Sequence, residues 1–117
     1  MADFTKVKLS GSTSGRGIKV VATATAGTAI HTATAGATNI DEVYLYACNA
    51  HTAAVTLTVE WGGTTDPDDL IEFTIPQSSG LYTVAPGLIL NGGLGIAAFG
   101  SIANVITIFG FVNRITA

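Results

Sequence analysis

Charged side chains are scarce in this chain of 117 residues. Five residues are Lys or Arg and eight are Asp or Glu, so that 11% of the chain is charged, against about 25% in a typical soluble domain. Apolar residues account for 48%. A monomer of this composition would expose large apolar areas to water, which folded monomers rarely do. We therefore expect other chains to cover part of the surface, in a homo-oligomer or a larger assembly.

Positive charge is missing from most of the chain, because no Lys or Arg occurs between Val20 and Asn113. The sequence divides into a basic, Gly/Ser-rich arm or edge strand over residues 1–17 and a mildly acidic body over residues 18–117. Two interpretations remain open. The arm is flexible and merely solvated, or it docks on an acidic neighbour, which could be another copy of the body. The basic residues near the N-terminus are Lys6, Lys8, Arg16 and Lys19.

Cysteine occurs only once, which excludes an intrachain disulfide. Cys48 ends a stretch with a strand pattern, and we expect a small buried apolar side chain there. The first residues lack the apolar core of a signal peptide, which indicates synthesis in the cytoplasm. Residues 73–113 carry no charge, but Pro, Gly, Asn and Ser interrupt this run before it provides the roughly 20 apolar positions of a membrane span. We therefore expect no contact with a membrane.

Apolar and polar residues alternate most strictly over residues 39–63. Because successive side chains of a strand point to opposite faces, the alternation predicts strands over 43–48 and 55–61, each with one buried face. The polar residues 49–52 are typical of a turn, so we expect a hairpin on which the rest of the fold is built. The expected core residues are Val43, Leu45, Ala47, Val55, Leu57, Val59 and Trp61, and those of the wetter face are Tyr44, Tyr46, Cys48, Thr56, Thr58 and Glu60.

Shorter strand patterns occur on both sides of this stretch. Turns rich in Gly and Pro separate them, and Asn91-Gly92-Gly93 is a strong hairpin signal. No segment predicts a helix. Eight to ten short strands at regular spacing predict an all-β fold, namely an antiparallel β-sandwich with jelly-roll topology as the preferred form. The remaining expected strands cover residues 4–9, 18–24, 28–34, 70–75, 81–84, 88–90, 95–99 and 105–115.

The last expected strand, 105–115, is apolar on both faces. Such a strand lies in a sheet that is covered on both sides, or its second face meets a partner subunit. Phe109 and Phe111 share one face of this strand. We therefore treat them as candidate contacts with a partner, together with the four basic residues Lys6, Lys8, Arg16 and Lys19.

No residue pattern predicts a catalytic, cofactor-binding or metal-binding residue. Cys48 and His51 flank a turn and lack a third orienting group, and we expect His31 to be packed or hydrogen-bonded. The acidic turn 66–69 lacks the calcium-loop pattern, so we expect a solvated turn, although cation binding there stays open. Aromatic residues do not accompany the basic ones as they do in nucleic-acid-binding proteins. We expect a non-enzymatic protein that has no cofactor and binds no nucleic acid.

Residues 39–116 carry a recognisable series of core and turn signals. A strand ends in Val59–Gly62, a segment that begins with Pro86-Gly87 leads into the turn Asn91-Gly92-Gly93, and the last strand closes with GFVNRI at 110–115. This series resembles small virion structural proteins of tailed bacteriophages, in particular capsid decoration (cement) proteins. The resemblance rests on residues that define a fold, and it implies no catalytic residue.

The resemblance implies a small β-sandwich, often trimeric, on the outer face of a head shell, where it clamps neighbouring major capsid subunits. From it we expect a virion structural protein that is made in the host cytoplasm and located on the capsid surface. Alternatives are another virion component, such as a head fibre base, neck or tail protein, and a small carbohydrate-binding β-sandwich that uses Tyr44, Tyr46 and Tyr82. The host, the symmetry site on the particle and an anchoring role of the arm stay open.

Overall fold

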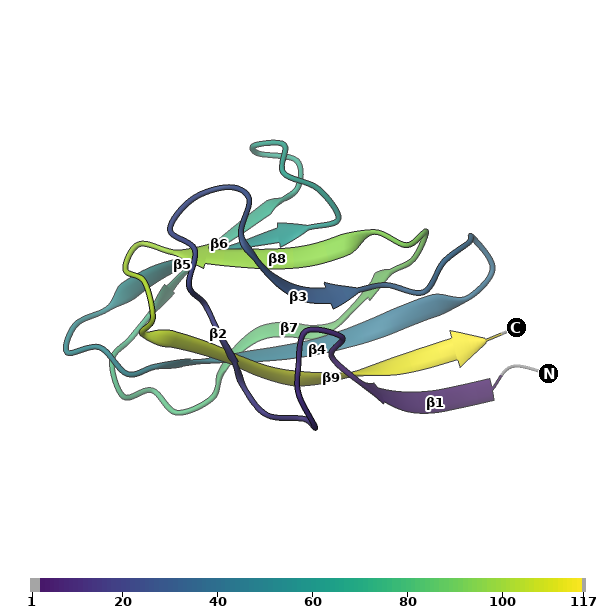
Figure 1. Ribbon diagram of the computed structural model, residues 1–117, viewed down its shortest axis with the longest axis horizontal. Coiled ribbons are helices and arrows are strands. Elements are labelled where there is room, and N and C mark those ends of the chain that lie inside the picture. Colours follow the sequence, from purple (N-terminus) through teal and green to yellow (C-terminus); the bar gives the residue numbers. More distant parts are fainter. Residues whose placement is uncertain (1–2, 117) are drawn as a thin grey trace.

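The computed structural model describes residues 3–116, which form nine strands in two antiparallel sheets and contain no helix (Figure 1). The predicted all-β sandwich is therefore confirmed. The strands are β1 (Asp3–Lys8), β2 (Ile18–Lys19), β3 (Thr28–Thr32), β4 (Ile40–Asn49), β5 (Val55–Trp61), β6 (Leu70–Ile75), β7 (Tyr82–Leu90), β8 (Gly95–Gly100) and β9 (Ile106–Thr116).

The five-stranded sheet, called sheet A, has the order β1-β9-β4-β7, with β2 also paired to β9. The four-stranded sheet, called sheet B, has the order β3-β8-β5-β6. The inward side chains of both sheets form one apolar core, because every second residue of a strand points to the same face. This core includes Val43, Leu45 and Ala47 from β4, Val55, Leu57 and Val59 from β5, and Ile106, Ile108 and Val112 from β9.

The strands β4 and β5 do not form the predicted hairpin. The strand β4 lies between β9 and β7 in sheet A, and β5 lies between β8 and β6 in sheet B. The side chain of Asn49 holds the connecting segment in this crossover. Its Nδ2 donates to the carbonyls of Ala53 at 3.0 Å and Ile75 at 2.9 Å, and its Oδ1 accepts the N–H of His51 at 2.8 Å. The alternation had identified the buried faces, but not the neighbours of each strand.

The turn Asn91-Gly92-Gly93 is not a hairpin turn either, because β7 belongs to sheet A and β8 to sheet B. The N–H groups of Gly92 and Gly93 donate to the carbonyls of Gly36 and Thr34, in the loop between β3 and β4. The expected strands 81–84 and 88–90 are one strand, β7. Its register against β4 shifts twice beside Pro86, and these irregularities accommodate the proline within a strand at the sheet edge.

The expected strand 18–24 is shortened to β2, because residues 22–27 leave sheet A and cross the outer side of sheet B. There they bury Glu60, which is 2% exposed although the alternation placed it on the wetter face. The hydroxyl of Thr25 donates to Glu60 Oε2 and the N–H of Gly27 donates to Oε1, both at 2.7 Å. Thr58, two residues before Glu60 on the same face of β5, is buried as well.

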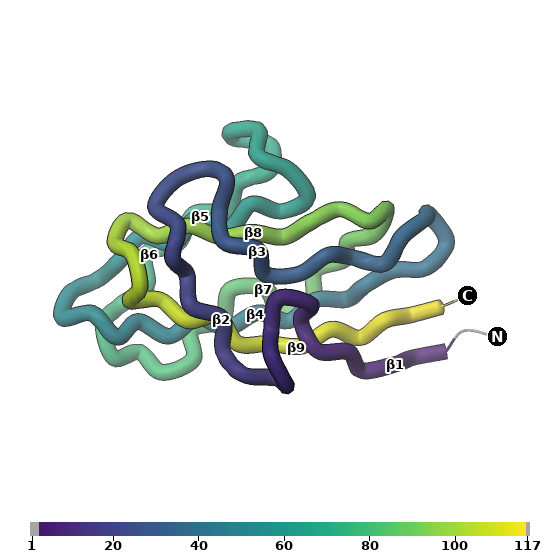
Figure 2. Tube along the Cα trace, in the orientation of Figure 1, coloured from purple at the N-terminus to yellow at the C-terminus, as the bar shows by residue number. Residues whose placement is uncertain are grey.

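Residues 3–8 of the N-terminal segment form the edge of sheet A. The strand β1 pairs with β9 over six residue pairs, from Asp3 opposite Thr116 to Lys8 opposite Phe111. The two ends of the described chain therefore lie side by side (Figure 2). Leu9 follows as a buried core residue. Residues 1 and 2 of the expected arm lie outside the described residues.

Trp61 and Cys48 also differ from their expected burial. Trp61 is only partly buried and packs against the margin of the core, because it is the last residue of β5. Cys48 is half-buried rather than buried, because it lies on the face of β4 that points away from the core.

Candidate functional site

The outward face of sheet A brings together four of the six residues that the sequence suggested as partner contacts. Directly opposite residues of antiparallel strands share a face of the sheet. Lys8 of β1 and Tyr44 of β4 lie opposite Phe111 on the two sides of β9, and Tyr46 lies opposite Phe109. The outer surface of sheet A is here defined by Phe4, Lys6, Lys8, Tyr44, Tyr46, Phe109 and Phe111.

An aromatic pair lies near the middle of this outer surface. The rings of Tyr44 and Phe111 stack with 4.7 Å between centroids and 12° between planes. The Nζ of Lys6 lies 4.9 Å from the centroid of Phe111, a cation–π distance. Tyr44 Oη donates to Glu42 Oε1 at 2.9 Å, and this hydrogen bond, followed by desolvation and the negative charge of Glu42, raises the pKa of Tyr44 above its ordinary value. The surface is thus ordered by cross-strand contacts and polar only at its margin.

Among residues 3–116, the β1–β2 connection covers this surface only at Phe109, where Gly17 lies against the ring. Ile106, Ile108 and Val112 of β9 are buried, whereas Phe109 and Phe111 on the outer face are half-buried. Phe4 is 71% exposed at the edge of the sheet, and Ile89 on β7 is 58% exposed at the opposite edge. Of the two interpretations of the last strand, cover from within the described chain is limited to the Phe109 end of its outer face, and contact with a partner stays a prediction.

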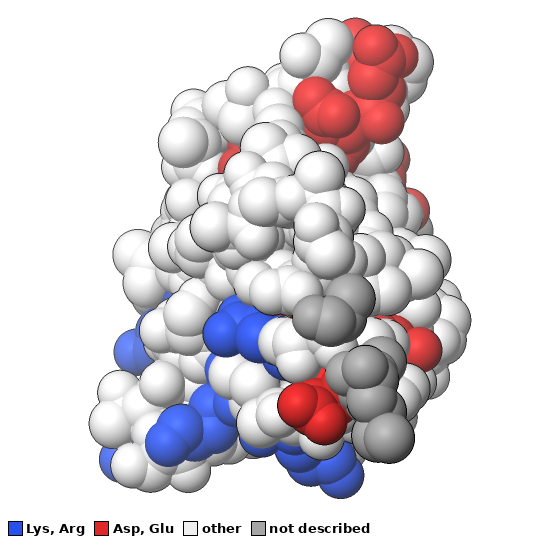
Figure 3. All heavy atoms as spheres, turned by 90° about the vertical axis from the view of Figure 1, so that its right-hand side faces the viewer, with Lys and Arg blue, Asp and Glu red and all other residues white. Residues whose placement is uncertain are grey.

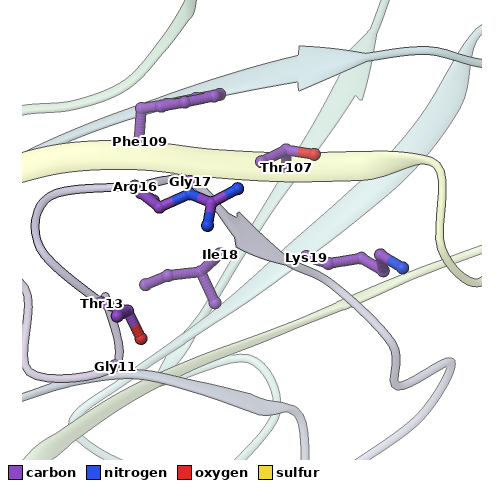
Figure 4. A pocket seen from close by; sticks show the side chains of 8 residues that line it. All are labelled: Gly11, Thr13, Arg16, Gly17, Ile18, Lys19, Thr107 and Phe109. Carbon is purple, nitrogen blue, oxygen red and sulfur yellow. The ribbon is translucent and has the colours of Figure 1, made fainter.

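Arg16 and Lys19, the other two candidate contacts, line a pocket at the margin of this surface. The pocket has a volume of about 630 Å³ and is bounded by the β1–β2 connection and β9. Figure 4 shows Arg16 and Lys19 beside β9, which contributes Thr107 and Phe109. No carboxylate lines this pocket within residues 3–116. We call it the basic pocket; its lining residues are Gly11, Thr13, Arg16, Gly17, Ile18, Lys19, Thr107 and Phe109.

Local hydrogen bonds fix the β1–β2 connection that forms one wall of the basic pocket. The N–H of Arg16 donates to the carbonyl of Thr13 at 2.9 Å, and the hydroxyl of Ser12 donates to the carbonyl of Arg16 at 2.6 Å. Gly17 lies against Phe109, where an added Cβ would come within 2.7 Å of the ring. A side chain at this position would push the connection away from β9, so that the glycine maintains the close approach.

An acidic cluster lies at the top of the molecule in Figure 3, whereas the basic side chains gather at the bottom, with acidic atoms also among them. The β5–β6 loop at the top of Figure 1 carries Asp66, Asp68 and Asp69, while four of the five basic residues belong to β1, β2 and their connection at the bottom. Asp69 is engaged within its own loop, because its Oδ2 accepts the N–H of Thr65 at 3.1 Å. No group of three or more His, Cys, Asp and Glu residues in the described chain is placed to hold a metal ion.

A buried ionic network that the sequence analysis missed joins His31, Asp41 and Arg114. Asp41 is completely buried. Its Oδ1 accepts Arg114 Nε at 2.8 Å, and its Oδ2 accepts His31 Nε2 at 2.8 Å, Arg114 Nη2 at 3.0 Å and the N–H of Thr34 at 3.1 Å. Burial by itself would raise the pKa of Asp41, but the hydrogen bonds and charge of Arg114 and the hydrogen bonds from His31 and Thr34 outweigh it and hold that pKa below its ordinary value.

The network could have been found from the alternation in the sequence. Asp41 is two residues before Val43, and Arg114 is two residues after Val112, so both charges continue the core-facing series of their strands. The register then places Asp41 directly opposite Arg114. The available signal was two opposite charges, Asp41 two residues before the predicted strand 43–48 and Arg114 within the predicted strand 105–115, because a buried charge requires a partner.

Ser10, His31 and Asp41 follow one another in the order of a nucleophile, a base and a carboxylate. Ser10 Oγ lies 3.2 Å from His31 Nδ1. However, Nδ1 already accepts the N–H of Ser10 at 3.0 Å, Ser10 Oγ accepts the N–H of Thr32 at 2.6 Å, and His31 is 3% exposed. A general base requires an available lone pair and access to a substrate. The three residues therefore form a structural link, in which hydrogen bonds connect the segment after β1 to β3 and β3 to β4.

The described residues contain no helix with the length and apolar character of a membrane span. Comparisons with protein-family models, with curated proteins and with solved structures found no match to this chain.

Proposed function

We propose that this chain is a non-enzymatic virion structural protein that decorates a tailed-phage capsid and stabilises it by bridging major capsid subunits. In this role it acts as a homo-oligomer, with a trimer favoured, on the surface of the particle. The proposal combines the resemblance of residues 39–116 with the distribution of apolar surface. It requires no cofactor, nucleic acid or membrane.

The observation that carries this proposal is the largely uncovered outer surface of sheet A in a chain with few charges. Protein interfaces are enriched in aromatic residues and Arg, and their centres are depleted of other charges. This surface has a stacked aromatic pair, Tyr44 and Phe111, at its middle, and lysines at its edge. An edge strand and a flat apolar face are features that a solitary protein normally protects. A second protein surface that covers them would remove both liabilities.

The strand order supports the finer proposal of a jelly roll. When β1 and β2 are counted as one interrupted strand, sheet A has the order 1-8-3-6 and sheet B the order 2-7-4-5. This order arises when an antiparallel strip of eight strands wraps around a barrel-like core, and jelly rolls of this kind occur in viral capsid proteins. The fold agrees with the proposed role but does not by itself assign it.

The proposal is tested by adding the purified chain to tailed-phage heads that lack a decoration protein and measuring co-sedimentation. We expect saturable binding and a higher temperature of head disruption. Phe4→Glu places a carboxylate at the exposed edge of the outer surface, and we expect binding to weaken about tenfold, or about 1.4 kcal/mol, because the variant loses an aromatic contact and must desolvate a charge on binding. Leu81→Glu is the matched control, because Leu81 is similarly exposed in the β6–β7 connection. A chain that binds none of the heads would contradict the proposal.

A carbohydrate-binding module is the second candidate, because aromatic rings on a flat sheet face suit the faces of sugar rings. Tyr44 and Tyr46 lie on the outer surface, whereas Tyr82 packs edge-to-face against Phe73 at 6.4 Å and against the core. A glycan array separates the two functions. Saturable glycan binding that Tyr46→Ala abolishes, without binding to heads, would favour the module.

A further inference from the structure

We infer that the basic pocket of one copy receives the acidic β5–β6 loop of a second copy, so that the chain assembles head to tail. The inference rests on the proposed structural role and names one partner of that surface. It involves Arg16 and Lys19 on one side and Asp66 and Asp68 on the other. The experiment below requires no virus particle, so that it can fail independently of the proposed function.

The basic pocket is built for carboxylates. Arg16 and Lys19 are both exposed, and neither forms an ion pair with another residue of the described chain. A guanidinium presents two parallel N–H donors to a carboxylate, and an ammonium adds a further donor. The hydroxyl of Thr13 and the ring of Phe109 line the same space. A carboxylate-bearing loop therefore finds both charged donors and an apolar contact there.

The acidic loop is ordered and presents two unused carboxylates. The N–H of Asp69 donates to the carbonyl of Thr65 at 2.8 Å, and the N–H of Trp61 donates to the carbonyl of Asp69 at 2.8 Å. These bonds, with the side chain of Asp69 on the N–H of Thr65, fix the loop. Asp66 and Asp68 are exposed and have no hydrogen bond or ion pair within residues 3–116. Their loss of freedom on binding is small because the loop is already ordered.

The two surfaces cannot meet within one molecule, because they lie at opposite ends (Figure 3). A contact between the bottom of one copy and the top of the next is heterologous. Heterologous contacts close into a ring when the rotation between copies allows it and otherwise form a filament. A ring of three copies would agree with the trimer expected for the proposed function. The charges select the orientation, and the apolar outer surface supplies the contact area.

The test reverses the charges on each side and measures self-association by light scattering and sedimentation at low and high salt. The first variant is Arg16→Glu with Lys19→Glu, and the second is Asp66→Lys with Asp68→Lys. The control is Glu72→Lys, which changes an exposed carboxylate on β6 outside the loop. The four altered residues are exposed, and circular dichroism melts verify that both variants fold.

The unaltered chain and the control are expected to self-associate, with weaker association at high salt. Each variant alone is expected to associate about tenfold less tightly or worse, because its pocket and loop now carry the same sign of charge. An equal mixture of the two variants is expected to regain association. In the mixture, the glutamates of the first variant's pocket attract the lysine loop of the second variant, and the basic pocket of the second variant attracts the acidic loop of the first. The two variants therefore alternate along the assembly, so that closed species contain equal numbers of both and a ring of three cannot form.

Three results would overturn the inference. The first is an unaltered chain that stays monomeric at low salt while the same chain binds phage heads, which leaves the proposed function intact. The second is that the pocket variant is monomeric but the loop variant still assembles, which assigns the pocket to another acidic partner. The third is a mixture that fails to associate although both variants are folded.

Discussion

Replacing Asp41 by Asn tests the buried network with a minimal change of shape. The carboxylate accepts four hydrogen bonds, three of them on Oδ2. An asparagine keeps the most contacts by placing its amide oxygen at Oδ2, which leaves its NH₂ facing Arg114 Nε. Three hydrogen bonds then lose their charge assistance and the fourth becomes a contact between two donors.

The expected loss in the free energy of unfolding is about 3 kcal/mol. Hydrogen bonds to a charged group contribute about 1 kcal/mol more than neutral ones, and three such bonds are weakened. Breaking a buried ion pair by removing one partner costs roughly 3–5 kcal/mol, and the lower end applies here because the Arg114 side chain is 32% exposed and keeps contact with water. The unfolding entropy of 117 residues is about 0.25 kcal/mol/K, so that the melting temperature should fall by about 12 °C.

Thermal and urea unfolding measured from pH 7 to pH 2.5 provide the assay. The pKa of Asp41 is lowered in the folded state, so its contribution is complete above the unfolded value near 3.8 and is lost as the pH falls through the folded-state value. The unaltered chain should therefore lose this stability below about pH 4, whereas D41N should lack this part of the acid dependence. The two curves should approach each other at the lowest pH.

Glu72→Gln is the control, because Glu72 is an exposed carboxylate and its replacement should change stability by less than about 0.5 kcal/mol. The double variant D41N with Arg114→Gln should cost less than the sum of its single variants, since both act on one network. The reasoning would be refuted if D41N cost less than about 1 kcal/mol at pH 7, or if its stability kept the acid dependence of the unaltered chain.

Two further variants test contacts that the fold requires. Gly110→Ala should cost about 2 kcal/mol or more in chemical unfolding, because its Cβ would meet the backbone carbonyl of Tyr44 and separate β9 from β4. Gly95→Ala is its control and should be nearly neutral, since the nearest atom to its Cβ is 4.0 Å away; an equal loss in both variants would contradict the account. Glu60→Gln can keep both contacts, since its amide oxygen can accept the N–H of Gly27 and its NH₂ can donate to the Thr25 hydroxyl, but both lose the charge of the carboxylate, so we expect a loss of about 1–2 kcal/mol and faster proteolysis at residues 22–27. Unchanged proteolysis would show that Glu60 does not hold this segment.

The sequence was most informative about which side of each strand faces the core. Val43, Leu45 and Ala47 are buried while Tyr44 and Tyr46 are half-buried, as the alternation predicts. This information is local, because period two follows from the geometry of a single strand. The apolar outer face of β9, with Phe109 and Phe111, was visible for the same reason, and it led to the candidate interaction surface.

The sequence failed where two segments distant in the chain decide the outcome. Glu60 alternates as a surface residue, yet residues 22–27 bury it, and nothing near position 60 indicates that cover. The glycines of Asn91-Gly92-Gly93 have the positive φ of a tight turn, but this turn connects two sheets and bonds to residues 34–36. A turn signal fixes the local path of the backbone and leaves open which strands pair.

The all-β class, most inward and outward faces, and the separation of basic and acidic segments could therefore be predicted, because each depends on neighbouring residues or on composition. The three-dimensional arrangement was needed to show that β4 and β5 belong to different sheets, that Asp41 meets His31 and Arg114, and that Arg16 and Lys19 share one pocket with Phe109. These pairings join residues up to 93 positions apart, from Arg16 to Phe109. They depend on how the two sheets stack, and that is a property of the whole core rather than of any single strand.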